Sequence, residues 1–152
     1  SLEKRERRDI LKTKLTGLWL NKAELALALP AVLRGTLLGS LLGILPGGGA
    51  IISSFTAYMV EKKSSRHPES FGKGNICGVA GPESANNSAS AGAMVPLLAL
   101  GIPFAPATAV LLGGLVIHGI APGPTFITAR PDLFWLVIAS MYIGNLMLLV
   151  LR

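Results

Sequence analysis

The chain has 152 residues, of which 51% are hydrophobic and 14% are charged, and its formal net charge is +6. Soluble domains usually carry about 25% charged residues, so this chain has too few polar side chains to cover a water-soluble core. Glycine and proline are abundant without a collagen-like period, and both residues are more frequent in transmembrane helices than in soluble ones. The composition therefore predicts an all-α integral membrane protein.

Two basic clusters account for the positive charge, one within residues 1–14 and one within residues 62–73. Each lies next to an apolar segment, which favours the positive-inside pattern of cytoplasmic loops over nucleic-acid binding. We therefore interpret residues 1–24 as a basic cytoplasmic or interfacial segment and residues 61–75 as a cytoplasmic loop, and we expect no nucleic-acid partner. The chain begins with Ser1 and ends inside an apolar run, so we expect it to be part of a longer protein.

Residues 25–45 form an apolar stretch just long enough to cross a bilayer as a helix. Gly35, Gly39 and Gly43 recur at every fourth position, which predicts a face of small residues for close packing against another helix. Arg34 interrupts the apolar stretch. In one interpretation Arg34 pairs with an acid or snorkels to the surface. In the other it attracts an anionic substrate. We favour pairing or snorkelling.

A helix break is predicted at Pro46, Gly47, Gly48 and Gly49, because proline lacks a backbone donor and glycine disfavours helix. An apolar segment follows, so residues 25–60 are predicted to form a helical hairpin with the break at its tip. Backbone N–H and C=O groups without helical partners are tolerated at membrane depth only where other protein segments bury them or where they line a water-filled cavity. The tip is therefore a candidate binding site.

The segment from Pro82 to Gly92 carries a carboxylate, two amides and three hydroxyls inside an otherwise apolar region. We expect residues 76–120 to form a broken-helix segment, with Pro82 in the first turn of a helix. A second break is predicted at Gly101 and Pro103. Two full spans and a second hairpin both fit this segment.

A last apolar span covers residues 131–152, and Asn145 is its one strongly polar interior residue. Paired helix breaks are the best sequence indication of a transporter site, so we expect a polytopic bundle with broken helices, part of an inverted-repeat transporter fold.

Half-helices that begin at mid-membrane present unpaired N–H groups to an anion, and freed carbonyls and polar side chains suit a cation such as Na⁺. Asn86 and Asn87 point about 100° apart on one helix, so both cannot serve one small site unless the helix is broken. Interhelical hydrogen bonding is the alternative role of this stretch. The substrate-binding candidates are Pro46, Gly47, Gly48, Gly49, Ser53, Ser54, Ser84, Asn86, Asn87, Gly101 and Pro103. The cation-binding candidates are Glu83, Ser84, Asn87 and Ser88.

Glu83 fits a helix-stabilising role in a first turn as well as it fits a cation or proton ligand. Sequence signatures of enzymes are absent: the glycine run lacks the lysine of a phosphate-binding loop, and the chain has no nucleophile elbow and no zinc-protease motif. We expect no catalytic activity and no cofactor apart from a possible coupling ion, Na⁺ or H⁺.

An ordered series of motifs carries a resemblance to a known family. It comprises the runs GILPGGGA at residues 43–50, GVAGPESANN at 78–87, PLLALGIP at 96–103 and HGIAPGP at 118–124. Together they resemble the large membrane subunit of the tripartite tricarboxylate transporters, the TctA family. The match extends over nearly the whole chain from Gly35 onward.

This resemblance implies a multi-pass subunit of the bacterial inner membrane that takes up citrate-like carboxylates, driven by a cation gradient. It also implies two protein partners, a small TctB-like membrane subunit and a periplasmic TctC-like solute-binding protein, besides the lipid bilayer and the carboxylate itself. The sequence departs from the family at Phe104 and Ala105, where a small polar pair is usual. A non-transporting membrane scaffold is the alternative, and an intramembrane enzyme is a weaker third.

Overall fold

The computed structural model describes residues 20–47 and 49–151. These residues form helices and no strand, as the composition predicts. The α-helices and the short 3₁₀ helix η2 are α1 (Lys22–Ile44), α2 (Ala50–Ser64), η2 (Pro68–Ser70), α3 (Cys77–Gly92), α4 (Met94–Leu100), α5 (Pro106–Ile117), α6 (Phe126–Ala129) and α7 (Pro131–Leu151). The predicted interfacial segment 1–24 lies mostly outside the described residues.

Local chemistry sets both ends of α1. The Asn21 side chain accepts a hydrogen bond from the Glu24 N–H, and the Asn21 N–H donates to the Glu24 carboxylate, both at 2.8 Å. This capping box satisfies two N–H groups that a helix start leaves unpaired. After Ile44 the chain turns through Gly47 and Gly49, whose φ angles of 78° and 44° only glycine adopts without strain.

Helices α1 and α3 run in the same direction and touch through their smallest residues. A Cβ atom on Gly35, Gly39 or Gly43 would collide with backbone of Gly81, Ala85 or Ala89, respectively. The glycine repeat of α1 therefore contacts α3, which confirms the predicted face for close packing. Between apolar helices in lipid, such close backbone contact replaces the hydrophobic effect as the source of association.

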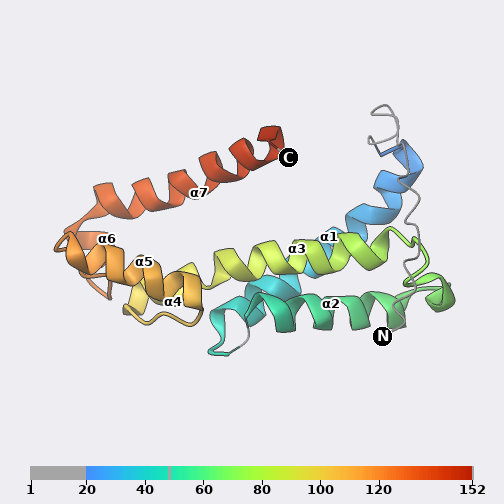
Figure 1. Cartoon of the computed structure of the whole chain (residues 1–152), viewed down its shortest axis with the longest axis horizontal. Coiled ribbons are helices and arrows are strands. Elements are labelled where there is room, and N and C mark those ends of the chain that lie inside the picture. Colours follow the sequence, from blue (N-terminus) through green and yellow to red (C-terminus); the bar gives the residue numbers. More distant parts are fainter. Residues whose placement is uncertain (1–19, 48, 152) are drawn as a thin grey trace, which may run out of the picture.

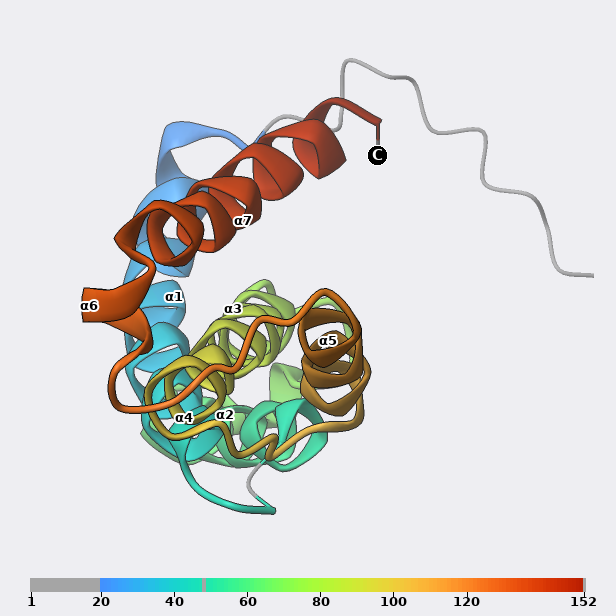
Figure 2. The ribbon, with the colours of Figure 1, turned by 90° about the vertical axis from the view of Figure 1, so that its left-hand side faces the viewer.

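Helix α2 folds back from the tip and packs against both α1 and α3, so α3 lies at the centre of a three-helix unit (Figures 1 and 2). Ser53, Ala57 and Glu61 recur at every fourth position of α2 and are buried. Helix α2 continues to Ser64, past the expected end of the hairpin at residue 60.

The prediction that Pro82 opens a helix is wrong. Helix α3 begins at Cys77, five residues earlier, because the Asn75 side chain accepts a hydrogen bond from the Cys77 N–H at 2.8 Å. Pro82 thus lies inside the helix, where its ring removes the hydrogen bond to the Gly78 carbonyl. Glu83 and Asn87 consequently sit in the middle of α3, not at its start.

Beyond α3 the chain turns at Ala93 into α4, breaks again after Leu100, and forms α5. Helix α7 then runs back over α4 and α3, close to them near α6 and farther away toward its own end (Figure 1). Helices α1 and α7 are each long and apolar enough to cross a membrane. Helix α5 is also apolar but has only 12 residues.

We expect Gly39→Ala to weaken the three-helix unit, because the added Cβ would lie 2.7 Å from the Ala85 Cα atom. Overpacking of this kind costs about 1–3 kcal/mol. The change should lower the midpoint of thermal unfolding of the full-length protein purified in detergent. The matched control is Gly113→Ala in α5, where a Cβ meets no atom within 4 Å. Equal midpoints for the two variants would contradict the packing of α1 on α3.

Candidate functional site

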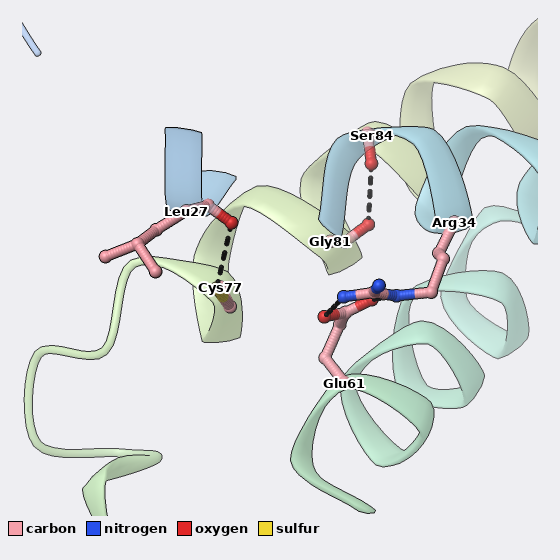
Figure 3. A network of polar contacts seen from close by, with 6 residues as sticks. All are labelled: Leu27, Arg34, Glu61, Cys77, Gly81 and Ser84. Atoms are coloured by element: carbon pink, nitrogen blue, oxygen red, sulfur yellow. Dashed lines mark hydrogen bonds and ion pairs between the residues drawn. The ribbon is translucent and has the colours of Figure 1, made fainter. Parts of the chain in front are cut away.

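Arg34 on α1 forms a two-pronged ion pair with Glu61 on α2 (Figure 3). The Arg34 Nε donates to Glu61 Oε1 and the Arg34 Nη2 donates to Glu61 Oε2, both at 2.7 Å. The Glu61 side chain is only 3% exposed, whereas that of Arg34 is 47% exposed. The structure therefore supports the favoured interpretation of Arg34 as the partner of an acid.

Gly81 on α3 makes room for this pair. A Cβ atom at Gly81 would approach Glu61 Cγ to 2.7 Å, which no real side chain tolerates. The glycine therefore lets the carboxylate enter the junction of the three helices. No sequence pattern marks Glu61 as a buried residue, because it stands next to Lys62 and Lys63 in what resembles a solvated charged turn.

Four of the predicted site hydroxyls bond within their own helices. Ser53 and Ser54 donate to the carbonyls of residues 49 and 50 at 2.8 and 2.9 Å, and Ser84 and Ser88 donate to those of residues 81 and 85 at 2.8 and 3.2 Å. Ser54 also reaches the Pro82 carbonyl at 3.3 Å. These hydroxyls lie at helix contacts, as expected for interhelical packing.

Helix α3 has one face of small buried residues and an opposite face of exposed polar residues. Gly81, Ala85 and Ala89 are buried against α1. Glu83 and Asn87 lie on the opposite side and are exposed, one helical turn apart. The Asn87 Nδ2 donates to the Glu83 carbonyl at 3.1 Å, so the Asn87 Oδ1 is the atom turned outward as an acceptor.

Asn86 lies on a different side of α3 from Asn87, because the helix is continuous through both residues. Asn86 is half-buried, and its carbonyl accepts a hydrogen bond from the Ser90 hydroxyl at 3.1 Å. The two amides are therefore not brought to one point. We name the exposed face made by Glu83, Asn87 and Ser90 the outer polar face of α3.

The glycine-rich tip is exposed at Pro46 and Gly47, and a Cβ at Gly47 or Gly49 would meet no atom within 4 Å. No side chain caps the N-terminus of α2 that follows. The helix start thus offers N–H groups and a positive dipole end to an anion. The predicted site residue Gly48 lies outside the described residues.

The second break differs from the first because protein groups satisfy it. Gly101, with a φ angle of 72°, donates its N–H to the Leu97 carbonyl at 2.9 Å. The Gly123 N–H donates to the Leu98 carbonyl at 3.2 Å, and the Thr108 hydroxyl caps the start of α5 at the Ala105 N–H at 3.0 Å. These bonds satisfy the named groups, whereas the N-cap residue of α5, like that of α2, provides no side-chain hydrogen bond to the helix start.

The two breaks also lie at different heights along the unit. Gly43, at the end of α1, packs beside Ala89, two residues after Asn87. Gly101 and Pro103 follow α4, and the path from Asn87 to Leu100 spans roughly 20 Å at about 1.5 Å per residue. The structure brings the first break, not the second, to the level of the amides.

Among the described residues, no group of three or more His, Cys, Asp or Glu side chains gathers in a form that holds a metal ion. A cation held by the described residues would therefore have at most two such side chains as ligands, and amide, hydroxyl or carbonyl oxygens would supply the others. Of the four predicted cation ligands, Glu83 and Asn87 share the outer polar face, whereas Ser84 and Ser88 face α1.

Apolar helices, glycine-mediated packing and an isolated polar face define the class of an α-helical membrane protein. The comparisons with known proteins identify the family. The model of the tripartite tricarboxylate transporter TctA family matches residues 1–152, so the chain belongs to this family. No solved structure matches the chain.

Two relatives come from Agrobacterium vitis. The chain is 49% identical over its full length to an uncharacterized 52.8 kDa protein in the TAR-I ttuC' 3' region, of which it covers 30%. It is 57% identical over 114 residues, 75% of the chain, to an uncharacterized protein in the TAR-II ttuC' 3' region, of which it covers 47%. The chain thus spans less than half the length of either relative.

We expect Arg34→Met to destabilise the full-length protein, because it leaves the buried Glu61 carboxylate without a partner. Breaking a buried ion pair costs about 3–5 kcal/mol, and the half-exposed Arg34 places this pair near the lower end. The midpoint of thermal unfolding should fall, and adding Glu61→Gln should restore much of it. As a control, Arg130→Met breaks a pair with Asp132 in which both side chains are more than half exposed, so the midpoint should hardly move. Equal shifts for the two arginine variants would contradict the role assigned to the buried pair.

Proposed function

We propose that the chain is part of the membrane subunit of a cation-coupled secondary transporter that takes up tricarboxylates or related organic acids. The observation that carries the proposal is the outer polar face of α3. Glu83, Asn87 and Ser90 are exposed on the side of α3 opposite α1, in a chain of which half the residues are hydrophobic. Polar groups placed at membrane depth by default mark a substrate or ion pathway.

The open tip between α1 and α2 supports an anionic substrate. The uncapped N-terminus of α2 binds a carboxylate through backbone N–H groups and the helix dipole. Gly47 and Gly49 leave space for the substrate to approach the backbone. In this proposal the tip holds the anion, and the outer polar face of α3 lines its path. No catalytic step is required.

Membership of a tripartite family supports two further proteins in the working transporter. We propose a small TctB-like membrane subunit and a periplasmic TctC-like protein that delivers the substrate. The proposed location is the bacterial inner membrane, with several crossings of the bilayer. Citrate is the first substrate to test, and Na⁺ and H⁺ are the coupling ions to compare.

A non-transporting scaffold is the second candidate, and the intrahelical serine hydrogen bonds favour it. If all polar residues of α3 served packing, their removal would change stability and leave transport intact. Asn87 discriminates the two functions, because its side chain is exposed and its Oδ1 points outward.

The test is uptake of radiolabelled citrate into proteoliposomes that hold the complete three-component transporter, with an imposed sodium or proton gradient. We expect Asn87→Ala to lower the uptake rate about 10- to 100-fold, the effect of losing a hydrogen bond to a charged group. The matched control is Ser140→Ala in α7, because the Ser140 hydroxyl only bonds the Val137 carbonyl at 2.7 Å. Unchanged uptake by Asn87→Ala would favour the scaffold, and no uptake of any carboxylate by the unmodified complex would refute the transporter.

A further inference from the structure

A polar cavity lies at the end of the three-helix unit opposite the glycine-rich tip, where the α2–α3 connection (residues 65–76) joins the two helices (Figure 1). Its volume of about 750 Å³ lies within the usual range of small-molecule sites, about 300–1,000 Å³. The connection contributes the basic side chains of Arg66 and Lys73 to the lining, and α1 contributes Leu27. None of the described residues that line the cavity is Asp or Glu. The cavity therefore suits an anion.

Contacts between elements that are distant in the sequence fix the walls of this cavity. The Cys77 thiol donates to the Leu27 carbonyl at 3.4 Å, which joins the start of α3 to α1 (Figure 3). The Cys77 N–H donates to the Asn75 Oδ1 at 2.8 Å, so this N–H group at the start of α3 already has a partner. Phe71 is 6% exposed, and its ring packs edge-on against Tyr58 of α2 with 5.6 Å between the ring centroids. The cavity is thus formed without a ligand.

Arg66 and Lys73 bring two positive charges to the cavity that no carboxylate of the described residues neutralises. Both residues are exposed, and neither forms an ion pair with another described residue. Glu69, the one acid of the connection, lies against His67 at 3.4 Å and does not line the cavity. Guanidinium and ammonium groups are common protein partners of phosphate, so the lining favours a phosphate group.

The apolar part of the lining favours a lipid phosphate over a soluble one. Helix α1 is long and apolar enough to cross a membrane, and Leu27 in its second turn is 62% exposed. Ile76, just before α3, adds a second apolar side chain to the lining. A soluble phosphate gains nothing from these side chains, whereas the acyl chains of a lipid bury apolar surface against them. Basic clusters beside a transmembrane helix are also typical of sites for acidic phospholipids.

We propose that the cavity binds the headgroup of an anionic phospholipid, such as phosphatidylglycerol. Arg66 and Lys73 hold the phosphate, and the acyl chains extend from Leu27 along the apolar surface of α1. The proposal depends on the location of the chain in a membrane and not on the transport of any substrate. Because the lipid contacts α1, the connection and the start of α3 together, its binding stabilises the three-helix unit.

The test measures the binding of phosphatidylglycerol to the full-length protein in detergent by native mass spectrometry. Combining Arg66→Gln with Lys73→Gln should weaken this binding about 10- to 30-fold, the effect of removing two basic side chains near an anionic headgroup. Each single variant should show part of the loss, and the exchange of Arg66→Lys with Lys73→Arg should retain most of the affinity. Phosphatidylcholine, which has no net charge, should bind more weakly than phosphatidylglycerol and respond little to these changes.

The matched control combines Lys62→Gln with Lys63→Gln. It removes the same charge from a neighbouring part of the chain, but these two lysines line a different cavity, of about 550 Å³, beside Met59 and Pro68. The control should therefore weaken the binding of phosphatidylglycerol far less. Equal losses in the two double variants would mean that the lipid is attracted by the basic surface as a whole, and the proposal would be wrong.

Two further outcomes would assign the cavity to another ligand. If glycerol 3-phosphate binds as tightly as phosphatidylglycerol and depends equally on Arg66 and Lys73, the site takes a soluble phosphate and the lipid assignment fails. If the double variant at these residues retains the lipid but no longer copurifies with a small membrane subunit, the cavity receives an acidic protein segment instead. The midpoint of thermal unfolding without added lipid should be unchanged, because both side chains are exposed and unpaired among the described residues.

Discussion

The close contact between α1 and α3 is the constraint on which the rest of the structure depends. Gly39 and Ala85 allow the two backbones to meet, and no larger side chain fits there. Because this face of α3 must point toward α1, the helical period places Glu83 and Asn87 on the far side. The position of the polar side chains is thus a consequence of the glycine repeat.

The polar residues described here fall into two groups with different structural roles. Serines at helix contacts bond to carbonyls of their own helices and let neighbouring helices approach without unsatisfied groups. Amides on exposed faces keep at least one atom available for a ligand or another segment. At the second helix break the Gly123 and Ala105 N–H groups donate to the Leu98 carbonyl and the Thr108 hydroxyl, and no comparable bond from a neighbouring segment is seen among the described residues of the first.

Sequence patterns predict the helical class, both breaks and the packing face of α1, because each depends on local geometry and residue size. The start of α3 differs from the prediction, because the Cys77 N–H donates to the Asn75 side chain and the helix begins there. Pro82 therefore lies inside α3 and not in its first turn. Glu61 could not be identified as the partner of Arg34, since 27 residues separate them and only the folded hairpin joins them. Which serines serve packing likewise depends on helix rotation, which no local pattern encodes.

The length of α2 has a consequence for how a ligand reaches the tip. Its 15 residues measure about 22 Å, less than the roughly 30 Å of hydrocarbon in a bilayer. In the proposed transporter, with Lys62 and Lys63 at the membrane surface, the tip at Gly47 lies inside the thickness of the bilayer. A ligand of the proposed tip site then requires a water-filled route between the surrounding helices.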